Sequence, residues 1–452
     1  MNRYNRDETA GHIEKGKNYR RLKQVDSALR EFSLALKKNP CNGELHAELG
    51  ETYIEKGHFA LGLKMLNKAV KYGFNQDWMH RSMVKAHYAS GRNDLITAET
   101  INYIKMTPDG TKPFYQNVLL NEKEISGKKI ILESKPRSLM VCLTTRCNLS
   151  CIMCRPEETG DIPRKTLLEI AGYFPYLQYI QWLGGEVFLS EYFEELFDSA
   201  SKYPYLHQAI TTNGLLIDDN WAYKLTGNNV WLEFSIDGLT KKTYEAIRTG
   251  AKFEDLIRCL NNINRHRRLH EKNLNFVTSM NFVVMKTNYH EIAHIADFAR
   301  QFRISNIVLS GVSGDLKNNE NIFLKKQTSI MDNLKKIVSY SQKKTQKYGI
   351  NLHNCLPIGS NDPSEINKAV YKRADDIFCF LPWQQLVLYP GHSAAPCCKV
   401  ERWKDKRSLN DIWNGKQMQL FRKKMLNDGY RNICAAACTL YGRNMEYSRF
   451  II

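Results

Sequence analysis

Residues 138–154 read SLMVCLTTRCNLSCIMC, an apolar run that passes directly into three closely spaced cysteines. The apolar part, Ser138–Leu143, has the length and composition of a buried β-strand. Cys147, Cys151 and Cys154 follow on one loop, with three and two residues between them. At this spacing three sulfur atoms can converge on one metal centre. The stretch therefore predicts a metal site at the C-terminal end of a strand.

The number of ligands distinguishes the metals that such a loop can hold. Structural zinc takes four tetrahedral ligands, and no fourth ligand stands near this loop in the sequence. Three thiolates on a cubane iron–sulfur cluster leave one iron without a protein ligand, which suits a catalytic cluster. We therefore expect a [4Fe–4S] cluster with one open iron on Cys147, Cys151 and Cys154.

Length and composition limit the class of protein. The chain has 452 residues, enough for about three domains, and its 43% apolar and 25% charged residues are typical of a folded globular protein. No apolar run reaches the ~18 residues of a membrane span, and the polar N-terminus lacks the apolar core of a signal peptide. We expect a cytoplasmic protein, in which the twelve cysteines serve as metal ligands or thiols rather than disulfides.

The net charge of +18 results from 65 Lys and Arg residues against 47 Asp and Glu residues. The basic residues occur in short scattered groups, without a zinc finger, an RNA-recognition signature or a continuous basic helix. We therefore expect a lysine-rich solvated surface and no specific nucleic-acid partner.

The first ~110 residues repeat with the period of a known helical-repeat class. Gly16, Tyr19, Ala28, Phe32, Ala35 and Pro40 recur 34 residues later as Gly50, Tyr53, Gly62, Leu66, Ala69 and Phe74. A weaker third copy runs from Trp78 to Pro108. The spacing resembles that of tetratricopeptide repeats, and an ordinary helical bundle is the alternative. Such repeats stack into a curved surface that binds a peptide or protein.

After this region, short apolar runs alternate with helix-length segments. The candidate strands are Ser138–Leu143, Tyr179–Leu183, Gln208–Thr212, Trp231–Ile236, Phe276–Val284 and Ile307–Ser310. Alternating strands and helices form βαβ units around a parallel sheet. Six units fall short of the eight of a complete barrel, so the pattern alone fits a partial barrel or an open sheet. In both, ligands bind at the C-terminal ends of the strands.

Polar motifs follow the next three predicted strands. They are Gly184-Gly185-Glu186, Thr211-Thr212-Asn213-Gly214, and Phe234-Ser235-Ile236-Asp237-Gly238 with Tyr244 and Arg248 behind it. Each motif alone is weak, but their order behind the cysteine triplet resembles the radical S-adenosylmethionine (radical SAM) superfamily over residues 138–312. The resemblance implies that the open iron binds S-adenosylmethionine and cleaves it reductively. The resulting 5′-deoxyadenosyl radical would abstract hydrogen from a substrate.

The same resemblance implies roles for these residues. The motif Gly184-Gly185-Glu186 would hold the amino group of the methionine moiety. Ser235 and Arg248 would hold the ribose or the carboxylate, because an arginine fork suits a carboxylate. Asn213 and Asp237 complete the predicted cofactor-binding set. No substrate-side acid or base is identified by the sequence.

Two positions depart from the pattern of the superfamily. Met153 stands where an aromatic residue is usual, and Val187 follows the glycine motif where proline is common. Methionine is flexible enough to cover an adenine ring. We therefore expect altered packing around the cofactor rather than lost binding.

A second group of cysteines lies near the C-terminus. The stretch QQLVLYPGHSAAPCC reads as a hairpin that turns at Pro390-Gly391, and a helical segment follows over Ser408–Met425. The arrangement resembles the SPASM/twitch extension of radical enzymes. We assign one auxiliary [4Fe–4S] cluster to Cys379, Cys397, Cys434 and Cys438, with Cys398 as the alternative to Cys397. Zinc is the competing metal, since four cysteines also suit it.

The sequence thus predicts an α/β fold of five parts. These are all-α helical repeats (1–110), a linker with short strands (111–137), a partial (β/α)6 TIM-type barrel (138–320), a connecting helical region (321–374) and a small C-terminal Fe–S module (375–452). An auxiliary cluster can accept the electron left after hydrogen abstraction. We expect a radical SAM oxidoreductase or maturase that oxidises or cross-links a peptide or protein.

The alternative is a dehydrogenase, or another radical modification, of a small sugar or alcohol, with the repeats used for protein assembly. Either reaction needs a low-potential electron donor of the flavodoxin or ferredoxin type. The positive net charge suits the docking of such an acidic donor.

Overall fold

The computed structural model describes residues 3–21, 24–89, 102, 113–154, 160–271, 273, 275–312, 316, 320–324, 328–358, 379–398 and 400–428. The chain divides into two compact units, residues 1–127 with 440–452, and residues 128–439. In the described ranges, no helix is both long and apolar enough to cross a membrane.

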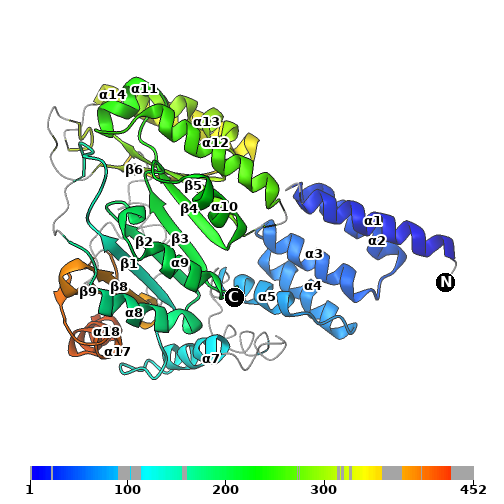
Figure 1. Cartoon of the computed structure of the whole chain (residues 1–452). Helices are drawn as coiled ribbons and strands as arrows, with labels where there is room; N and C mark the ends of the chain where they lie inside the picture. Colours follow the sequence, from blue (N-terminus) through cyan, green and yellow to red (C-terminus); the bar gives the residue numbers. More distant parts are fainter. Residues whose placement is uncertain are drawn as a thin grey trace. The chain divides into compact units, whose positions relative to one another are not determined.

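The described part of the first unit is all-α (Figure 1). Its helices are α1 (Arg3–Arg21), α2 (Val25–Lys38), α3 (Gly43–Glu55), α4 (Phe59–Lys71), α5 (Asp77–Ala89) and α7 (Pro113–Ser126). Helices α2 and α4 begin 34 residues apart, as do α3 and α5. The predicted period is therefore the period of the helices. Beyond Ala89 the predicted third copy lies outside the described residues, apart from Asn102.

Two glycines one period apart let paired helices approach closely. A Cβ atom on Gly16 would lie 2.5 Å from the ring of Phe32, and one on Gly50 would lie 2.8 Å from Leu66. Phe32 and Leu66 are fully buried in two separate apolar clusters. These contacts explain why glycine recurs at these two positions, while the assignment to tetratricopeptide repeats stays a prediction.

In the described residues, the second unit is built on a ten-stranded sheet with the order β10-β9-β8-β1-β2-β3-β4-β5-β6-β7. The strands are β1 (Ser138–Thr144), β2 (Tyr179–Gly184), β3 (His207–Thr212), β4 (Val230–Ser235), β5 (Val277–Val284), β6 (Asn306–Gly311), β7 (Asn351–Cys355), β8 (Gln385–Tyr389), β9 (Ser393–Ala395) and β10 (Trp403–Lys404). Strands β1 to β7 pair in parallel, and β8 is parallel to β1. The six predicted strands and the α/β class are confirmed.

Helices pack on one face of this sheet (Figure 1). They are α8 (Arg164–Tyr173), α9 (Phe193–Ser201), α10 (Asp219–Gly227), α11 (Lys241–Ile247), α12 (Phe253–Leu269), α13 (Ile295–Gln301) and α14 (Thr328–Tyr348). Trp182 of β2 contacts Phe193 of α9, with ring centroids 5.9 Å apart. Since side chains alternate along a strand, Gln181 and Leu183 lie on the opposite face, which we call the inner face.

Two elements differ from the sequence predictions. Strand β7 adds a seventh parallel strand inside the segment 321–374 that we expected to be helical. Its sequence, NLHNC, is short and polar, which suits a strand at the edge of the sheet, and within the described ranges β7 pairs only with β6. Helix α7 lies in the predicted linker, where we expected short strands. It begins at Pro113, whose fixed φ angle suits the first position of a helix.

The C-terminal segment extends the same sheet. Strands β8 and β9 form the predicted antiparallel hairpin, in which Gly391 takes a φ of +68° at the turn. The predicted helical segment divides into α17 (Leu409–Trp413) and α18 (Lys416–Asp428). Because β8 pairs with β1, the C-terminal cysteine module is anchored to the strand that leads to the first cysteine loop.

Candidate functional site

The loop after β1 carries the three clustered cysteines and is held by backbone hydrogen bonds to the end of α11. The Ser150 N–H donates to the Thr249 carbonyl at 2.9 Å, and the Ile152 N–H donates to the Ile247 carbonyl at 3.0 Å. These bonds position the loop over the segment that follows β4.

The three sulfur atoms lie in different surroundings. Cys147 and Cys154 are exposed, and Cys151 is half-buried. The Leu149 N–H donates to Cys147 Sγ at 3.4 Å. Burial raises the pKa of the Cys151 thiol, and the nearby Arg248 guanidinium opposes this shift. Within the described residues, no three His, Cys, Asp or Glu side chains form a group that could hold a metal ion.

The glycine pair after β2 fits against the start of this loop. A Cβ atom on Gly184, which has a φ of +146°, would lie 2.1 Å from the Thr144 carbonyl oxygen. One on Gly185 would lie 2.2 Å from the Arg146 carbonyl oxygen. The Gly185 N–H donates to the Thr144 carbonyl at 2.7 Å. Only glycine allows these approaches, so the pair docks β2 against the cysteine loop.

Glu186 follows the glycines and is fully buried. Its carboxylate accepts hydrogen bonds from Thr212 Oγ1 and the Asn213 N–H, both at 2.8 Å, and from the Phe188 N–H at 3.5 Å. Burial raises the pKa of Glu186, and these donors oppose the shift. The carboxylate therefore ties the end of β2 to the end of β3. Its predicted contact with an ammonium group stays a proposal.

Asn213 joins the end of β3 to the cysteine loop. Its Nδ2 donates to Asn148 Oδ1 at 2.8 Å, and its Oδ1 accepts from the Leu215 N–H at 2.9 Å. Sequence reasoning placed Asn213 in the cofactor-binding set, quoted Thr212 only as part of the strand-end motif, and missed Asn148. The signal for Asn148 was a polar residue between the cysteines.

Asp237 and Arg248 form a buried ion pair behind the loop. Arg248 Nη2 lies 2.6 Å from Asp237 Oδ2, and the two residues are 7% and 0% exposed. The Val283 N–H donates to Asp237 Oδ1 at 2.7 Å. Arg248 Nη1 also lies 3.7 Å from Cys151 Sγ. Both residues predicted to bind the cofactor thus already have partners inside the protein.

The remaining predicted positions also lie near this edge of the sheet. Ser235 is the last residue of β4, lies half-buried, and pairs in register with Asn281 of β5. Met153 packs against an apolar cluster that includes Ile247 and Met285. Predicted site residues from β2, β3 and the segment after β4 therefore surround one cysteine loop.

This arrangement fits the group that the sequence predicts. Thiolates are the ligands that iron–sulfur clusters require. A backbone N–H at Cys147 and a guanidinium at Cys151 provide the outer contacts that stabilise sulfur ligands. Cys147, Cys151 and Cys154 are therefore suited to hold a cluster.

The second cysteine group is described in part. Cys379 is half-buried, Cys397 is buried and Cys398 is exposed. Cys434 and Cys438 lie outside the described residues. The choice between Cys397 and Cys398, and the complete ligand set, stay proposals.

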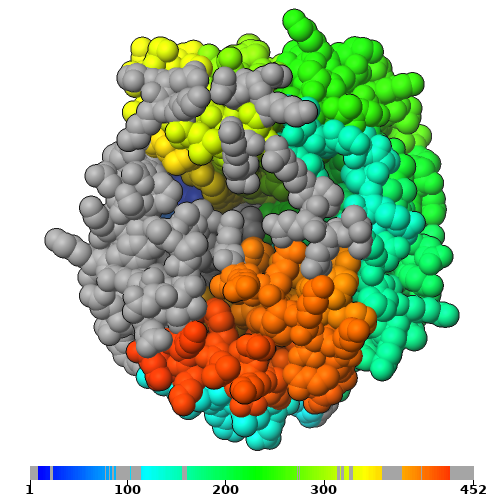
Figure 2. All heavy atoms as spheres, turned by 90° about the vertical axis from the view of Figure 1, so that its left-hand side faces the viewer, coloured from blue at the N-terminus to red at the C-terminus, as the bar shows by residue number. Residues whose placement is uncertain are grey.

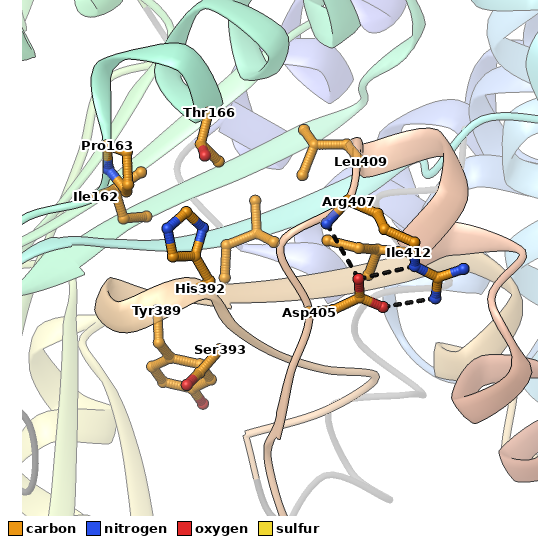
Figure 3. Close-up of a pocket in the computed structure, with 11 residues that line it drawn as sticks. Ile162, Pro163, Thr166, Tyr389, His392, Ser393, Asp405, Arg407, Leu409 and Ile412 are labelled. Atoms are coloured by element: carbon orange, nitrogen blue, oxygen red, sulfur yellow. Dashed lines mark hydrogen bonds and ion pairs between the residues drawn. The ribbon is translucent and has the colours of Figure 1, made fainter.

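A small pocket separate from these cysteines lies between the start of α8 and the β8–β9 hairpin (Figure 3). His392 points toward Ile162 and Thr166 in it. Asp405 and Arg407, whose ion pair measures 2.7 Å, lie on one side. No residue predicted to bind the clusters or the cofactor lines this pocket.

Two family models match the chain. The model of the radical SAM superfamily matches residues 141–299, and the model of the SPASM iron–sulfur cluster-binding domain matches residues 379–439. The first range contains the cysteine loop and all three polar motifs. The second contains Cys379, Cys397, Cys398, Cys434 and Cys438.

Curated relatives match parts of the chain. It is 27% identical to a GTP 3′,8-cyclase of Synechocystis over 37% of this chain and 52% of the relative. It is 28% identical to the mycofactocin maturase MftC of Mycobacterium ulcerans over 27% of this chain and 34% of the relative. The chain thus spans about half the length, or less, of these relatives.

The fold is also similar to that of a solved structure. SuiB of Streptococcus suis, crystallised with its precursor peptide SuiA, superposes with a TM-score of 0.52 at 16% sequence identity. The match covers 79% of this chain and 87% of SuiB.

Proposed function

Since the chain carries a radical SAM domain followed by a SPASM domain and is thus a radical SAM enzyme, we propose that it oxidises or cross-links a peptide or protein. Radical SAM domains bind S-adenosylmethionine and a [4Fe–4S] cluster, and SPASM domains bind auxiliary iron–sulfur clusters. The observation that carries the proposal is the pairing of β8 with β1. It joins both cysteine groups through one sheet, in a fold similar to that of SuiB, which was crystallised with a precursor peptide.

Cys147, Cys151 and Cys154 are proposed to hold the catalytic cluster. When bound, this cluster supplies the electron that cleaves S-adenosylmethionine to a radical able to abstract hydrogen from the substrate. Gly184, Gly185, Glu186, Asn213, Ser235, Asp237 and Arg248 are the proposed cofactor-binding set.

Within this set, the structure favours different tasks for different residues. Gly184 and Gly185 hold the loop against β2, and Asn213 holds it against β3 through Asn148. Arg248 carries a buried positive charge beside Cys151. The same charge suits the carboxylate of the methionine moiety, because charge-assisted hydrogen bonds are the strong ones.

Cys379, Cys397, Cys434 and Cys438 are the proposed ligands of one auxiliary cluster, with Cys398 as the alternative to Cys397. Such a cluster would take up the electron that remains when a substrate radical closes to an oxidised product. We propose a flavodoxin- or ferredoxin-type protein as the external donor, since the chain carries a net charge of +18. The helical unit is proposed to bind part of the peptide or protein substrate, as curved helical arrays do.

A small-molecule substrate is the second candidate. Several curated relatives that match the chain at 27–30% identity are GTP 3′,8-cyclases. Oxidation of a small sugar or alcohol belongs to the same candidate class. In that case the helical unit would serve protein assembly.

The test uses the reconstituted, anaerobically reduced enzyme with S-adenosylmethionine. The substrates tested are GTP and a short precursor peptide, which is to be sought among the genes beside this one. We expect 5′-deoxyadenosine formation to rise with the peptide, whose mass should fall by two hydrogen atoms per modification. Turnover of GTP without peptide modification would establish the second candidate instead.

A variant without the helical unit separates docking from chemistry. It should lose modification of the peptide and keep the slow cleavage of S-adenosylmethionine that occurs without substrate. Full peptide turnover by this variant would contradict the docking role.

A further inference from the structure

Arg248 places a positive charge directly beside the cysteine loop. Its Nη1 donates to Cys151 Sγ at 3.7 Å, and its Nη2 donates to Asp237 Oδ2 at 2.6 Å. The two hydrogen bonds use different nitrogens of one planar group, so the guanidinium bridges the sulfur and the carboxylate. The charge of Arg248 is therefore held against a proposed ligand of the catalytic cluster.

Backbone contacts fix the distance between this charge and the sulfur. The Ile152 N–H donates to the Ile247 carbonyl at 3.0 Å. This bond joins the residue after Cys151 to the residue before Arg248. On the other side of the ion pair, the Val283 N–H donates to the second carboxylate oxygen at 2.7 Å. The guanidinium and the sulfur are thus held together by the fold, and their contact does not depend on ordering an exposed side chain.

Burial protects this interaction from solvent. Arg248 is 7% exposed and Asp237 is 0% exposed. Figure 2 shows a hollow between the orange residues of the C-terminal strands and the yellow residues near β7. Water in such a hollow would screen a charge that faced it, whereas a buried charge acts through a lower dielectric. We therefore expect the charge of Arg248 to act on the nearby sulfur with little screening.

The sign of this action follows from the charges. Reduction adds one electron to a [4Fe–4S] cluster, so the reduced form is the more negative one. A positive charge and an N–H donor at a ligand sulfur both stabilise that form, which raises the reduction potential. Asp237 opposes the effect, but its carboxylate contacts the guanidinium, while the guanidinium itself contacts the sulfur. Because the Coulomb energy falls with distance, the nearer charge of Arg248 outweighs that of Asp237 at the sulfur.

We propose that Arg248 raises the reduction potential of the cluster bound by the cysteine loop, and that Asp237 is the positioning residue that holds Arg248 in place. The inference rests on the proposed function, since it takes this cluster as the one that cleaves S-adenosylmethionine. A higher potential lets an external donor of the flavodoxin or ferredoxin type reduce the cluster more completely. This role is separate from the proposed contact of Arg248 with the methionine carboxylate, because it acts in the enzyme without the cofactor.

The experiment measures the midpoint potential of this cluster in the reconstituted enzyme without S-adenosylmethionine. Electron paramagnetic resonance follows the reduced cluster during an anaerobic titration with dithionite. Its signal is identified as the one that changes when S-adenosylmethionine is added to a separate sample. In the double variant Asp237→Asn, Arg248→Gln, no buried charge is left unpaired. We expect the ratio of reduced to oxidised cluster at a given ambient potential to fall about ten-fold, a decrease of about 59 mV for a one-electron couple.

Further variants separate the charge from a merely structural role. Arg248→Lys keeps the positive charge and should have a midpoint above that of the double variant, although an ammonium lacks the planar fork. Arg258→Gln removes an exposed arginine that pairs with Asp255 and should leave the midpoint unchanged. If the double variant does not bind iron, Arg248→Gln alone takes its place in the comparison. Equal midpoints in Arg248→Lys and in the variant with glutamine, or a midpoint of the latter equal to that of the unaltered enzyme, would overturn the proposal.

Cofactor cleavage and peptide modification separate this inference from the proposed function. If the midpoint depends on Arg248 but the enzyme neither cleaves S-adenosylmethionine nor modifies a peptide, the effect of Arg248 on the cluster stands and the proposed function fails. If the enzyme cleaves the cofactor and modifies a peptide, but its midpoint does not depend on Arg248, the proposed function stands and this inference fails.

Discussion

Arg248 donates a hydrogen bond of 2.6 Å to the carboxylate of Asp237, and both side chains are almost completely buried. Asp237 follows β4, and Arg248 follows α11 on the way to α12. The second guanidinium nitrogen lies 3.7 Å from the sulfur of Cys151. The pair therefore connects the end of a central strand to the cysteine loop through one rigid contact.

Asp237→Asn should strongly destabilise the protein. The substitution leaves the Arg248 charge buried without its counter-ion, which typically costs about 3–5 kcal/mol. The double variant Asp237→Asn, Arg248→Gln should lose much less free energy of unfolding than the sum of the losses in the two single variants. Urea unfolding of the cluster-free protein measures the four variants of this cycle. Glu254→Gln, at an exposed ion pair, is the control and should barely move the midpoint.

Gly185→Ala should prevent the cysteine loop from docking. The added Cβ would lie 2.2 Å from the Arg146 carbonyl oxygen. This oxygen belongs to the backbone, so it can move away only if the chain itself is displaced. We expect the variant to lose catalytic cluster iron on reconstitution, measured by iron analysis and absorbance. Gly172→Ala in α8, where a Cβ meets no atom within 4 Å, should keep full iron and gain roughly 0.5–1 kcal/mol of stability. Normal iron in Gly185→Ala would contradict the docking role.

Iron and zinc analysis tests whether the C-terminal cysteines hold a second iron–sulfur cluster or a zinc ion. The reconstituted enzyme should hold about eight irons per chain, as two cubane clusters require. Replacing Cys147, Cys151 and Cys154 by alanine should leave about four and abolish S-adenosylmethionine cleavage. Replacing Cys379 should affect only the second set. About four irons with about one zinc in the unaltered enzyme would show that the C-terminal site binds zinc.

His207 should make stability sensitive to acid. Burial lowers its pKa below the ordinary value of 6.5, so below about pH 6.5 the unfolded chain binds a proton that the folded chain does not. Stability should therefore fall as the pH is lowered through that value. His207→Gln removes this proton uptake. The free energy of unfolding of the variant should therefore fall less between pH 7.5 and 5.5 than that of the unaltered protein. Urea midpoints of the unaltered protein and the variant at both pH values make the comparison.

The sequence identified most of the elements that carry the site. The strand that leads to Cys147 was visible because β1 is buried along its whole length, so its apolar run is continuous. Strand β7 was missed because it lies at the edge of the sheet and alternates exposed with half-buried residues. The helical character of α7 was missed because its apolar residues are interrupted by Asn, Gln and Glu.

The candidate site residues also divide into those that the sequence identified and those that it missed. The glycine pair was found because only glycine permits the approach to Thr144 and Arg146, which leaves a mark in the sequence. The contact of Gln181 and Thr211 with Glu233 was not predicted, because a polar residue inside a strand gives no sign of which strands will be its neighbours. Their contact depends on the order β2-β3-β4 and on the registers of these strands.

The sequence by itself therefore determined the chemistry at the strand ends: three thiols on one loop, a glycine pair, and polar motifs in a fixed order. These are local features, since each is specified by the covalent spacing of a few residues. Only the tertiary structure decided which groups meet across the sheet: Arg248 with Cys151, Asn213 with Asn148, and Gln181 and Thr211 with Glu233 on the inner face. Those contacts join residues that are distant along the chain, and strand order and register, which bring them together, result from the packing of the whole unit.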